Sequence, residues 1–565
     1  MVNKLQQTRR FTSTWLGLLI IILLMLGIVF RFVNLDQKTY WIDETFTSLR
    51  ISGYRLSDMI PEISNGDAIA IKELHKYQQT NPEKQLIGTI KGLAFEEPQH
   101  PPLYYVMARF WSQLFGNSVA VRRSFSALIS LLVFPAIYWL CQELFDSSLV
   151  GWVAMALVAV SPFQVLYAQA ARQYGLWTVT ILLSSAALLR AIRLTKRRNT
   201  TNKIRDILHF ISTWGIYALT LVTGFYTFLF SILVAISHGI YVLVTERFRF
   251  SKIIVYYGLS SLMALMVFVP WLLISNSNLS KVSSKTKWAL QEVPLSSLAQ
   301  TWLININRNF FDLNQGLNFP SVVVSVIILI LVGYAIYFLC RHSPKRVSLF
   351  ILTLIGVTAV ALVLPDLISG GKRSSVTRYL IPCYLGIQLA VAYLFTNKIT
   401  NKITNKITSI FQGVWQQKLW RLGMILLLSG GILSCVISSQ SEFWWNKYTS
   451  ANHTQVAAVI NQAEQPLLLT KSLELISLSY LLDPKVKFGW LSQKSVKMPN
   501  GEKSKQLIIP ENTDEFSDVF LYNPSRELRE KIEKQYNYKS ELIGKWNHKL
   551  EPTYEIKTFL WKLVK

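Results

Sequence analysis

The chain has 565 residues, of which 51% are hydrophobic and only 16% are charged, and it contains 17 Trp, 24 Tyr and 30 Phe. This composition excludes an ordinary soluble domain and is typical of a protein that crosses a membrane several times. The formal net charge of +26 would suit a nucleic-acid partner, but the basic residues cluster between apolar segments, so we expect no nucleic-acid partner.

The apolar segments predict an all-α polytopic membrane protein with about eleven transmembrane helices, each of roughly 20 residues. They lie near residues 14–33, 124–144, 149–166, 174–194, 208–224, 225–245, 253–274, 320–340, 347–364, 379–395 and 422–440. The apolar stretch from Pro101 to Phe115 is short, begins with Pro-Pro and carries Arg109. We therefore predict a helix lying in the membrane interface there.

The positions of the basic residues predict the topology. They gather before the first span and in alternate loops, at Lys4, Arg9 and Arg10; Arg190, Arg193, Lys196, Arg197, Arg198, Lys203 and Arg205; Arg247, Arg249 and Lys252; Arg341, Lys345 and Arg346; Lys398, Lys402, Lys406 and Lys418. With a cytoplasmic N-terminus, all of these fall on the inner side. We expect a multi-pass protein of a bacterial inner membrane, with residues 34–123, 275–319, 370–378 and 442–565 in the periplasm.

Two domains are expected. Residues 1–441 form the transmembrane domain, which includes the first periplasmic loop at 34–123. Residues 442–565 form a small periplasmic α/β domain, because apolar runs such as 466–470 and 518–522 are typical of strands.

An acidic pair follows the first span closely. Asp43 and Glu44 lie in the segment from Tyr40 to Thr45, at a predicted membrane–water boundary. Ionisable groups are costly there and are therefore functional candidates. The alternative is a solvated loop anchored by the interfacial Trp41.

Three further motifs emerge on the same predicted face. They are His100-Pro101-Pro102-Leu103-Tyr104-Tyr105, the loop from Ser161 to Tyr174 with its Ala171-Arg172-Gln173-Tyr174 end, and Arg378-Tyr379-Leu380-Ile381-Pro382. In this order and orientation the four motifs resemble the family 39 polyprenyl-phosphate-dependent glycosyltransferases, which include protein O-mannosyltransferases and lipid A aminoarabinose transferases. The likeness covers roughly residues 14–395.

The resemblance implies the GT-C fold and transfer of a sugar from a polyprenyl-phosphate donor to an acceptor hydroxyl or phosphate. Asp43 matches the family's catalytic aspartate, a general base, and Glu44 would orient the acceptor. Arg172, Arg378 and His100, with Tyr174 and Tyr379 from the same motifs, would hold the donor phosphate. Acceptors among such enzymes include protein hydroxyls, lipid A phosphate and envelope glycans. The membrane lipid polyprenyl phosphate is then a partner.

No cofactor is required by this chemistry. No G-x-G-x-x-G occurs, and the segment Gly370 to Ser375 lacks the upstream glycine of a phosphate loop. No cluster of His and carboxylates has ligand spacing, so no metal site is predicted. A divalent ion stays an open alternative, because oligosaccharyltransferases with the same fold use one.

Other interpretations remain for the individual residues and for the whole chain. The arginines could be interfacial side chains that snorkel towards water, and His100 could be a structural residue of a turn. Many spans also suit a transporter or flippase of lipid-linked sugars, although no internal repeat is found. A third alternative is a scaffold for envelope assembly, which would explain the tail but not the Asp43 motif.

Overall fold

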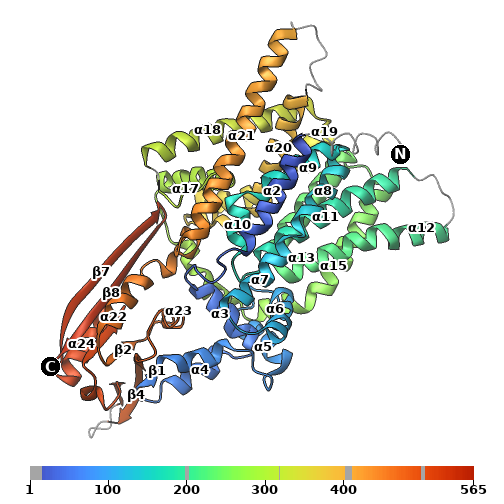
Figure 1. Cartoon of the computed structure of the whole chain (residues 1–565). Helices are drawn as coiled ribbons and strands as arrows, with labels where there is room; N and C mark the ends of the chain where they lie inside the picture. Colours follow the sequence, from blue (N-terminus) through green and yellow to red (C-terminus); the bar gives the residue numbers. More distant parts are fainter. Residues whose placement is uncertain (1–14, 198–202, 317, 401–409, 498–502) are drawn as a thin grey trace. The chain divides into compact units, whose positions relative to one another are not determined.

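The computed structural model describes residues 15–197, 203–316, 318–400, 410–497 and 503–565 (Figure 1). The predicted cytoplasmic residues Lys4, Arg9, Arg10, Arg198, Lys402 and Lys406 lie outside this part of the chain. The chain forms two compact units. We call the first, which contains Met1–Leu35, Glu97–Tyr104 and Arg122–Ser441, the membrane unit. The second, the loop–tail unit, contains Asp36–Glu96, Tyr105–Val121 and Glu442–Lys565.

Helices make up the membrane unit. In chain order they are α2 (Trp15–Phe32), α7 (Val119–Ser130), α8 (Val133–Phe145), α9 (Ser148–Ala159), α10 (Pro162–Ala168), α11 (Tyr174–Lys196), α12 (Lys203–His209), η2 (Phe210–Trp214), α13 (Gly215–Thr227), α14 (Ser231–Thr245), α15 (Lys252–Ser277), α16 (Leu279–Thr286), η3 (Lys287–Leu290), α17 (Leu295–Asn307), α18 (Phe319–His342), α19 (Lys345–Ser369), η4 (Arg373–Ser375), η5 (Thr377–Leu380), α20 (Ile381–Thr400) and α21 (Ile410–Gln440).

All eleven predicted spans coincide with helices. Among the described residues, eight helical stretches are long and apolar enough to cross a membrane, and the pair α9 and α10, bent by 64°, would make a ninth. The other two predicted spans are the shorter apolar helices α2 and α14. The chain is thus a polytopic membrane protein, as predicted. The bend has a local cause, because Pro162 disfavours helical backbone at the residue before it.

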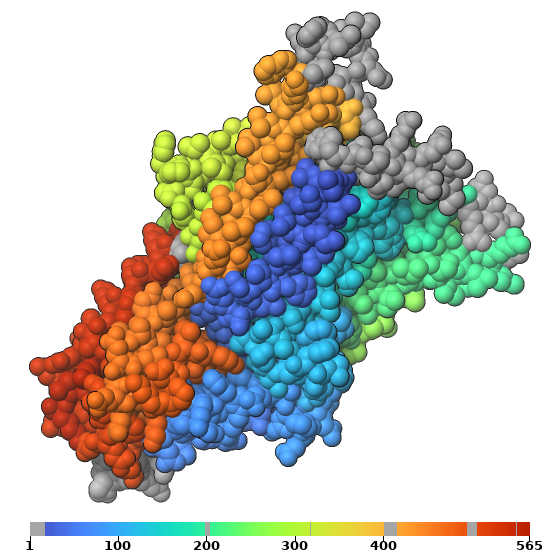
Figure 2. Space-filling view, in the orientation of Figure 1, coloured from blue at the N-terminus to red at the C-terminus, as the bar shows by residue number. Residues whose placement is uncertain are grey.

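Two helices form the interior of the membrane unit. The apolar windows of α11 and α20 are 83% and 89% buried, whereas that of α15 is only 22% buried. Exposed apolar side chains such as Leu262 and Met266 on α15 face outward, as lipid-facing residues do. Helix α2 lies along α21, blue beside orange in Figure 2, and Asn34 Nδ2 donates a hydrogen bond to the Ser439 carbonyl at their ends. The two interior helices begin at the predicted Arg172 and Arg378 motifs.

The loop–tail unit combines short helices with strands. In chain order it contains α3 (Ile42–Ser52), α4 (Leu56–Ile63), β1 (Ile69–Ala70), η1 (Ile71–Gln78), α5 (Gln85–Glu96), α6 (Leu103–Phe115, from Tyr105 on), η6 (Trp445–Ser450), α22 (His453–Gln462), β2 (Pro466–Thr470), α23 (Leu475–Leu478), β3 (Lys487–Trp490), β4 (Ser492–Lys497), β5 (Lys503–Ile508), η7 (Thr513–Glu515), β6 (Asp518–Tyr522), α24 (Arg526–Tyr536), β7 (Lys539–Glu551) and β8 (Tyr554–Val564).

A six-stranded sheet is the centre of this unit, with strand order β1-β3-β2-β6-β8-β7. Strand β2 runs parallel to β3 and β6, and β8 runs antiparallel to β6 and β7. Leu468 of β2 packs into one apolar core, while Leu467 and Leu469 pack into the other, so both faces of the sheet are covered. The predicted α/β tail is confirmed, and the apolar runs 466–470 and 518–522 are the strands β2 and β6.

The first outer loop supplies an edge strand to this sheet. Ile69 of β1 pairs with Phe488 of β3 in antiparallel register. The structure therefore groups residues 36–96 and 105–121 with the tail, whereas the sequence pattern assigned the whole of 34–123 to the transmembrane domain. A two-residue strand carries too little pattern to predict this pairing.

The segment around Arg109 forms the helix α6, as predicted, and α6 is not among the stretches long enough to cross a membrane. Its location in the membrane interface stays a prediction. Arg109 is buried, and its guanidinium donates hydrogen bonds of 2.8 Å to the carbonyl oxygens of Ile51 and Asn81. Arg109, whose charge made a transmembrane span improbable, thus connects α6 to the segment that contains α3.

Candidate active site

The acidic pair opens helix α3. Trp41 is its N-cap residue, and Asp43 and Glu44 lie in the first turn. Carboxylates are stabilised at a helix N-terminus because the backbone N–H groups there point outward. Asp43 is half-buried and Glu44 is fully buried. The Thr47 hydroxyl donates to the Asp43 carbonyl oxygen (3.1 Å), which fixes the backbone of this turn.

Glu44 forms a buried ion pair with the tail. Lys447 Nζ lies 2.6 Å from Glu44 Oε2, and the two side chains are only 2% and 0% exposed. Lys447 belongs to η6, just after the last span, and its ammonium also lies 6.0 Å from the centre of the Trp41 ring. A charge buried this deeply needs a partner of opposite sign. Lys447 was not predicted from the sequence, where the available signal is a lone lysine among Trp444, Trp445 and Tyr448.

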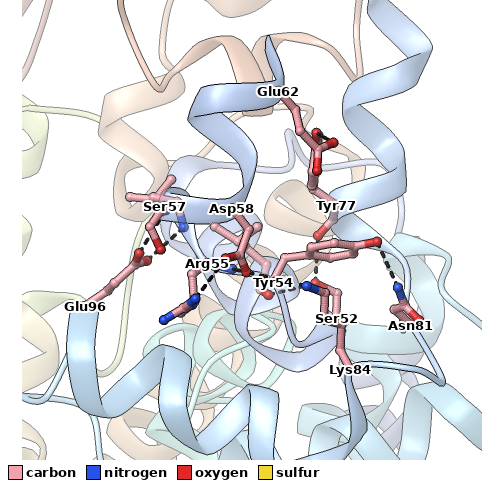
Figure 3. A network of polar contacts seen from close by, with 12 residues as sticks. Ser52, Tyr54, Arg55, Ser57, Asp58, Glu62, Tyr77, Asn81, Lys84 and Glu96 are labelled. Carbon is pink, nitrogen blue, oxygen red and sulfur yellow. Dashed lines mark hydrogen bonds and ion pairs between the residues drawn. The ribbon is translucent and has the colours of Figure 1, made fainter. Parts of the chain in front are cut away.

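A polar network holds the other end of α3, as Figure 3 shows. The Ser52 hydroxyl donates to the Tyr77 carbonyl oxygen (2.7 Å), and the Tyr77 hydroxyl donates to Glu62. Burial, with the hydrogen bond to Glu62, raises the pKa of Tyr77 to about 12, so this phenol stays a donor at neutral pH. Nearby, Glu96 accepts hydrogen bonds from the first backbone amides of α4, at Leu56 and Ser57. Helix α3 is therefore anchored at both ends.

The predicted basic residues come together in the membrane unit. Arg172 Nη2 lies 3.3 Å from His100 Nε2, and the side-chain amide of Gln173 lies 3.2 Å from His100 Nδ1. Because a guanidinium can only donate, His100 Nε2 is the acceptor for Arg172. The Gln173 atom nearest to Nδ1 is the amide nitrogen Nε2. His100 therefore lies between the side chains of Arg172 and Gln173 and helps to position Arg172.

The His100 segment is itself held by neighbouring helices. Trp271 Nε1 and the Ser275 hydroxyl of α15 both donate to the Pro98 carbonyl oxygen, at 3.1 and 2.9 Å. The Tyr104 hydroxyl lies 2.7 Å from Ser126 Oγ. These contacts fix the position of the segment that carries His100. A fixed position agrees both with a role in binding and with the alternative of a structural turn residue.

Two arginines share one aromatic ring. The guanidinium carbons of Arg172 and Arg378 lie 5.9 and 5.8 Å from the centre of the Tyr174 ring, and Arg378 lies 5.6 Å from that of Tyr379. Both arginines are buried, at 3% and 8% exposure, so neither is a lipid-facing side chain that snorkels. Contacts of this length are typical of cation–π interactions. The arrangement concentrates positive charge at the start of the two interior helices.

A buried amide network lies next to Arg378 in sequence and adds a third arginine. Asn305 of α17 accepts hydrogen bonds from Arg308 Nη1 and the Thr377 hydroxyl, both 2.9 Å long, and its amide donates to the Ser375 carbonyl oxygen (3.0 Å). Arg308 is 2% exposed. Arg308 was not predicted from the sequence, because the segment that carries it contains no recognisable motif.

The glycine segment that superficially echoes a phosphate loop wraps a carboxylate. Asp366 accepts hydrogen bonds from the backbone N–H and hydroxyl of Ser374, both 2.7 Å, and from Arg373 (2.8 Å). Gly371 has φ of +125°, and a Cβ there would lie 2.9 Å from the Asp366 carboxylate, so glycine is required. The segment is therefore a turn built around an acidic side chain.

Other basic residues also lie in the predicted outer loops. Arg123, which faces the predicted outer side, donates a 2.7 Å hydrogen bond to the Leu35 carbonyl oxygen and so fixes the chain after α2. Lys281, Lys285 and Lys287 are exposed. Within the described part of the chain, no group of three or more His, Cys, Asp or Glu side chains is placed to hold a metal ion.

The membrane unit also contains an apolar cleft. It has a volume of about 600 Å³ and lies between α18, α20 and α21. Phe310 and Phe311, two and three residues after Arg308, form part of its lining, together with Trp420. Its walls suit a hydrocarbon chain.

The chain is a polytopic membrane protein whose fold belongs to the GT-C class, as the following structural match shows. The structure of ArnT from Cupriavidus metallidurans bound to undecaprenyl phosphate matches with a TM-score of 0.50 and 12% identity, over 97% of this chain and 98% of that one. The apo form of ArnT matches with a TM-score of 0.49 and 14% identity, over 96% and 97% of the two chains. The oligosaccharyltransferase AglB from Archaeoglobus fulgidus, in complex with an inhibitory peptide and a dolichol-phosphate, matches with a TM-score of 0.45 and 12% identity, over 84% and 65%.

The sequence comparison points to a family. Residues 99–274 match the family described as dolichyl-phosphate-mannose-protein mannosyltransferase. This range includes His100, Arg172 and Tyr174 and ends before Arg378. No curated protein sequence matches the chain. The chain is thus similar to membrane glycosyltransferases that use polyprenyl-phosphate lipids, as its motifs predicted.

Proposed function

We propose that this protein is an integral-membrane glycosyltransferase that moves a sugar from a polyprenyl-phosphate donor to an acceptor hydroxyl or phosphate on the periplasmic face of a bacterial inner membrane. The observation that carries the proposal is the pair of buried guanidiniums around Tyr174. Two cations held this way suit a phosphate group better than a neutral substrate, because each planar fork can donate two hydrogen bonds to phosphate oxygens.

In this proposal the donor phosphate is bound by Arg172 and Arg378, with Tyr174 and Tyr379 beneath the guanidiniums. His100 keeps Arg172 in place by accepting its hydrogen bond. Arg308, held by Asn305, is a further candidate for the same anion. The apolar cleft, which Phe310 lines, would bind the isoprenoid chain of the donor.

Asp43 is the proposed general base. It removes the proton of the acceptor hydroxyl, the acceptor oxygen bonds to the anomeric carbon, and the bond from that carbon to the phosphate oxygen breaks. The lipid phosphate leaves with the bonding electrons, and the arginines stabilise the charge that it gains. Glu44 is held by Lys447 and therefore orients the turn that carries Asp43. The proposal needs no nucleotide and no cofactor.

The test is an assay in detergent. Purified full-length protein is given a polyprenyl-phosphate sugar and a mixture of envelope glycans, lipid A and peptides, and release of free polyprenyl phosphate is measured. Release by the wild type that is lost with Asp43→Asn supports the proposal. Donor binding without release, for every acceptor supplied, would instead favour a transporter of lipid-linked sugars, since detergent leaves no second compartment to which a sugar could move.

A further inference from the structure

A polar cavity lies at the C-terminal end of helix α11. It has a volume of about 490 Å³ and is lined by residues of α8, α11, α14 and α19. Helix α11 begins at Tyr174, beside the arginine pair, and ends at Lys196, which lines this cavity. A helix of 23 residues is about 35 Å long, which exceeds the roughly 30 Å of bilayer hydrocarbon. The cavity and the proposed donor site therefore lie at opposite membrane surfaces.

Four basic residues line the cavity, and two of them are already neutralised. Arg193 donates two 2.7 Å hydrogen bonds to Glu143, one to each carboxylate oxygen. Lys196 Nζ lies 2.8 Å from Glu246 Oε1. These pairs fix the positions of two cations and give the cavity part of its wall.

The other two basic residues have no such partner. Arg197, which follows α11, and Arg346, in the first turn of α19, are exposed, and neither makes a side-chain hydrogen bond or ion pair with any residue that the structure describes. The two carboxylates in the lining, Glu143 and Asp146, leave the four cations in excess. The lining also includes Leu189 and Ile192, so the cavity joins a cationic rim to an apolar wall.

We propose that this cavity binds the phosphate headgroup of an anionic membrane lipid from the leaflet opposite the donor site. Arg197 and Arg346 hold the phosphate oxygens through their guanidinium forks. Leu189 and Ile192 contact the first methylene groups of the lipid. Basic pockets between transmembrane helices at a membrane surface are suited to such headgroups. The proposal is independent of the glycosyltransferase function.

Native mass spectrometry of the full-length protein in detergent tests the site. Five probes are titrated separately: phosphatidylglycerol, cardiolipin, undecaprenyl phosphate, zwitterionic phosphatidylethanolamine and inorganic phosphate. The double variant Arg197→Gln/Arg346→Gln is compared with Arg190→Gln/Arg341→Gln, which removes two exposed arginines of the neighbouring surface that do not line the cavity. We expect the first pair to weaken binding of an anionic lipid about tenfold or more, and the second to change it less than about twofold.

The pattern of binding identifies the source of the phosphate. Retention of phosphatidylglycerol or cardiolipin that depends on Arg197 and Arg346 supports a phospholipid. Retention of undecaprenyl phosphate alone, lowered by this pair but not by Arg172→Lys, supports the carrier lipid. Equal binding of phosphatidylethanolamine, binding of inorganic phosphate alone, or equal losses in both double variants would overturn the proposal. If the double variant does not purify as a single species, Arg346→Gln alone is tested in the same way.

Discussion

Lys447 Nζ lies 2.6 Å from Glu44 Oε2 across 403 residues of sequence, and both side chains are almost completely buried. The pair joins the turn that carries Asp43 to the segment that follows the last span. It makes the position of the acidic motif dependent on a residue of the tail that is far from it in the sequence.

The first prediction concerns the stability of this pair. Lys447→Met and Glu44→Gln should each lower the free energy of unfolding by about 3–5 kcal/mol, because each leaves one buried charge without its partner. The double variant should lose less than the sum of the two. Unfolding in detergent measures this, with Glu530→Gln on the exposed surface of α24 as a control that should cause no measurable change. Additive losses would contradict the coupling.

The second prediction separates chemistry from binding at Asp43. Asp43→Asn should lower kcat by about 10²–10⁴ because it removes the base without changing the size of the side chain. The affinity for the polyprenyl-phosphate donor should stay within about twofold of wild type. Turnover is followed by release of polyprenyl phosphate, and affinity by direct binding. A variant with nearly normal turnover would remove Asp43 from this role.

The third prediction concerns the arginines around Tyr174. Arg172→Lys and Arg378→Lys keep the positive charge but lose the fork, so donor affinity and turnover should both fall, by about ten- to a hundredfold for each site. Arg190→Lys, an exposed change on the same helix as Tyr174, is the matched control. Unchanged donor affinity in both variants would exclude a phosphate-binding role.

The fourth prediction is the orientation in the membrane. Cysteine placed at Ser283 or Lys485 should react with a membrane-impermeant thiol reagent added outside intact cells, and cysteine at Ser343 should not. Both outer positions are exposed in the structure. The background is Cys340→Ser, since Cys340 is exposed and Cys141, Cys383 and Cys435 are buried. Labelling at Ser343 alone would invert the topology and move the acidic motif to the cytoplasm.

The fifth prediction is acid sensitivity of the loop–tail unit. Burial lowers the pKa of His453, at the start of α22, from 6.5 to about 4. Because the folded state then binds fewer protons than the unfolded state, stability is lost as the pH falls from about 6.5 towards 4, by about 2 kcal/mol at pH 5.

His453→Gln, which cannot be protonated, should therefore show a smaller drop in the unfolding temperature between pH 7 and pH 5 than the wild type. Thermal unfolding at the two pH values measures the difference. An equal drop in both proteins would show that other groups cause the sensitivity.

Patterns that are local in sequence were sufficient for much of the fold. The helices at the eleven predicted positions follow from runs of apolar residues, and β2 and β6 follow from short apolar runs between turns. That Leu103–Phe115 is a short helix and not a candidate span agrees with what Arg109 and the preceding prolines predicted. In each case the signal lies within about 20 residues, the range over which periodicity and hydropathy act.

The features that were not predicted depend on distant contacts. The pairing of β1 with β3, the ion pair of Glu44 with Lys447 and the hydrogen bond from Thr377 to Asn305 each join segments without a shared pattern. A lysine or arginine has the same local signature whether it is solvated or buried with a partner. The roles of Asp43, Glu44, His100, Arg172, Tyr174, Arg378 and Tyr379 remain predictions for the experiments above.

The pairing of the first outer loop with the tail has a consequence for biogenesis. Glu44 and Lys447 are 403 residues apart, and so at about 5–20 residues per second the ribosome makes Lys447 roughly 20–80 seconds after Glu44. During this interval the strand β1 has no β3 to pair with, and the carboxylate of Glu44 has no Lys447 beside it. A chain that stalls after the last span would thus contain every helix of the membrane unit while the turn that carries Asp43 and Glu44 lacks its partner from the tail.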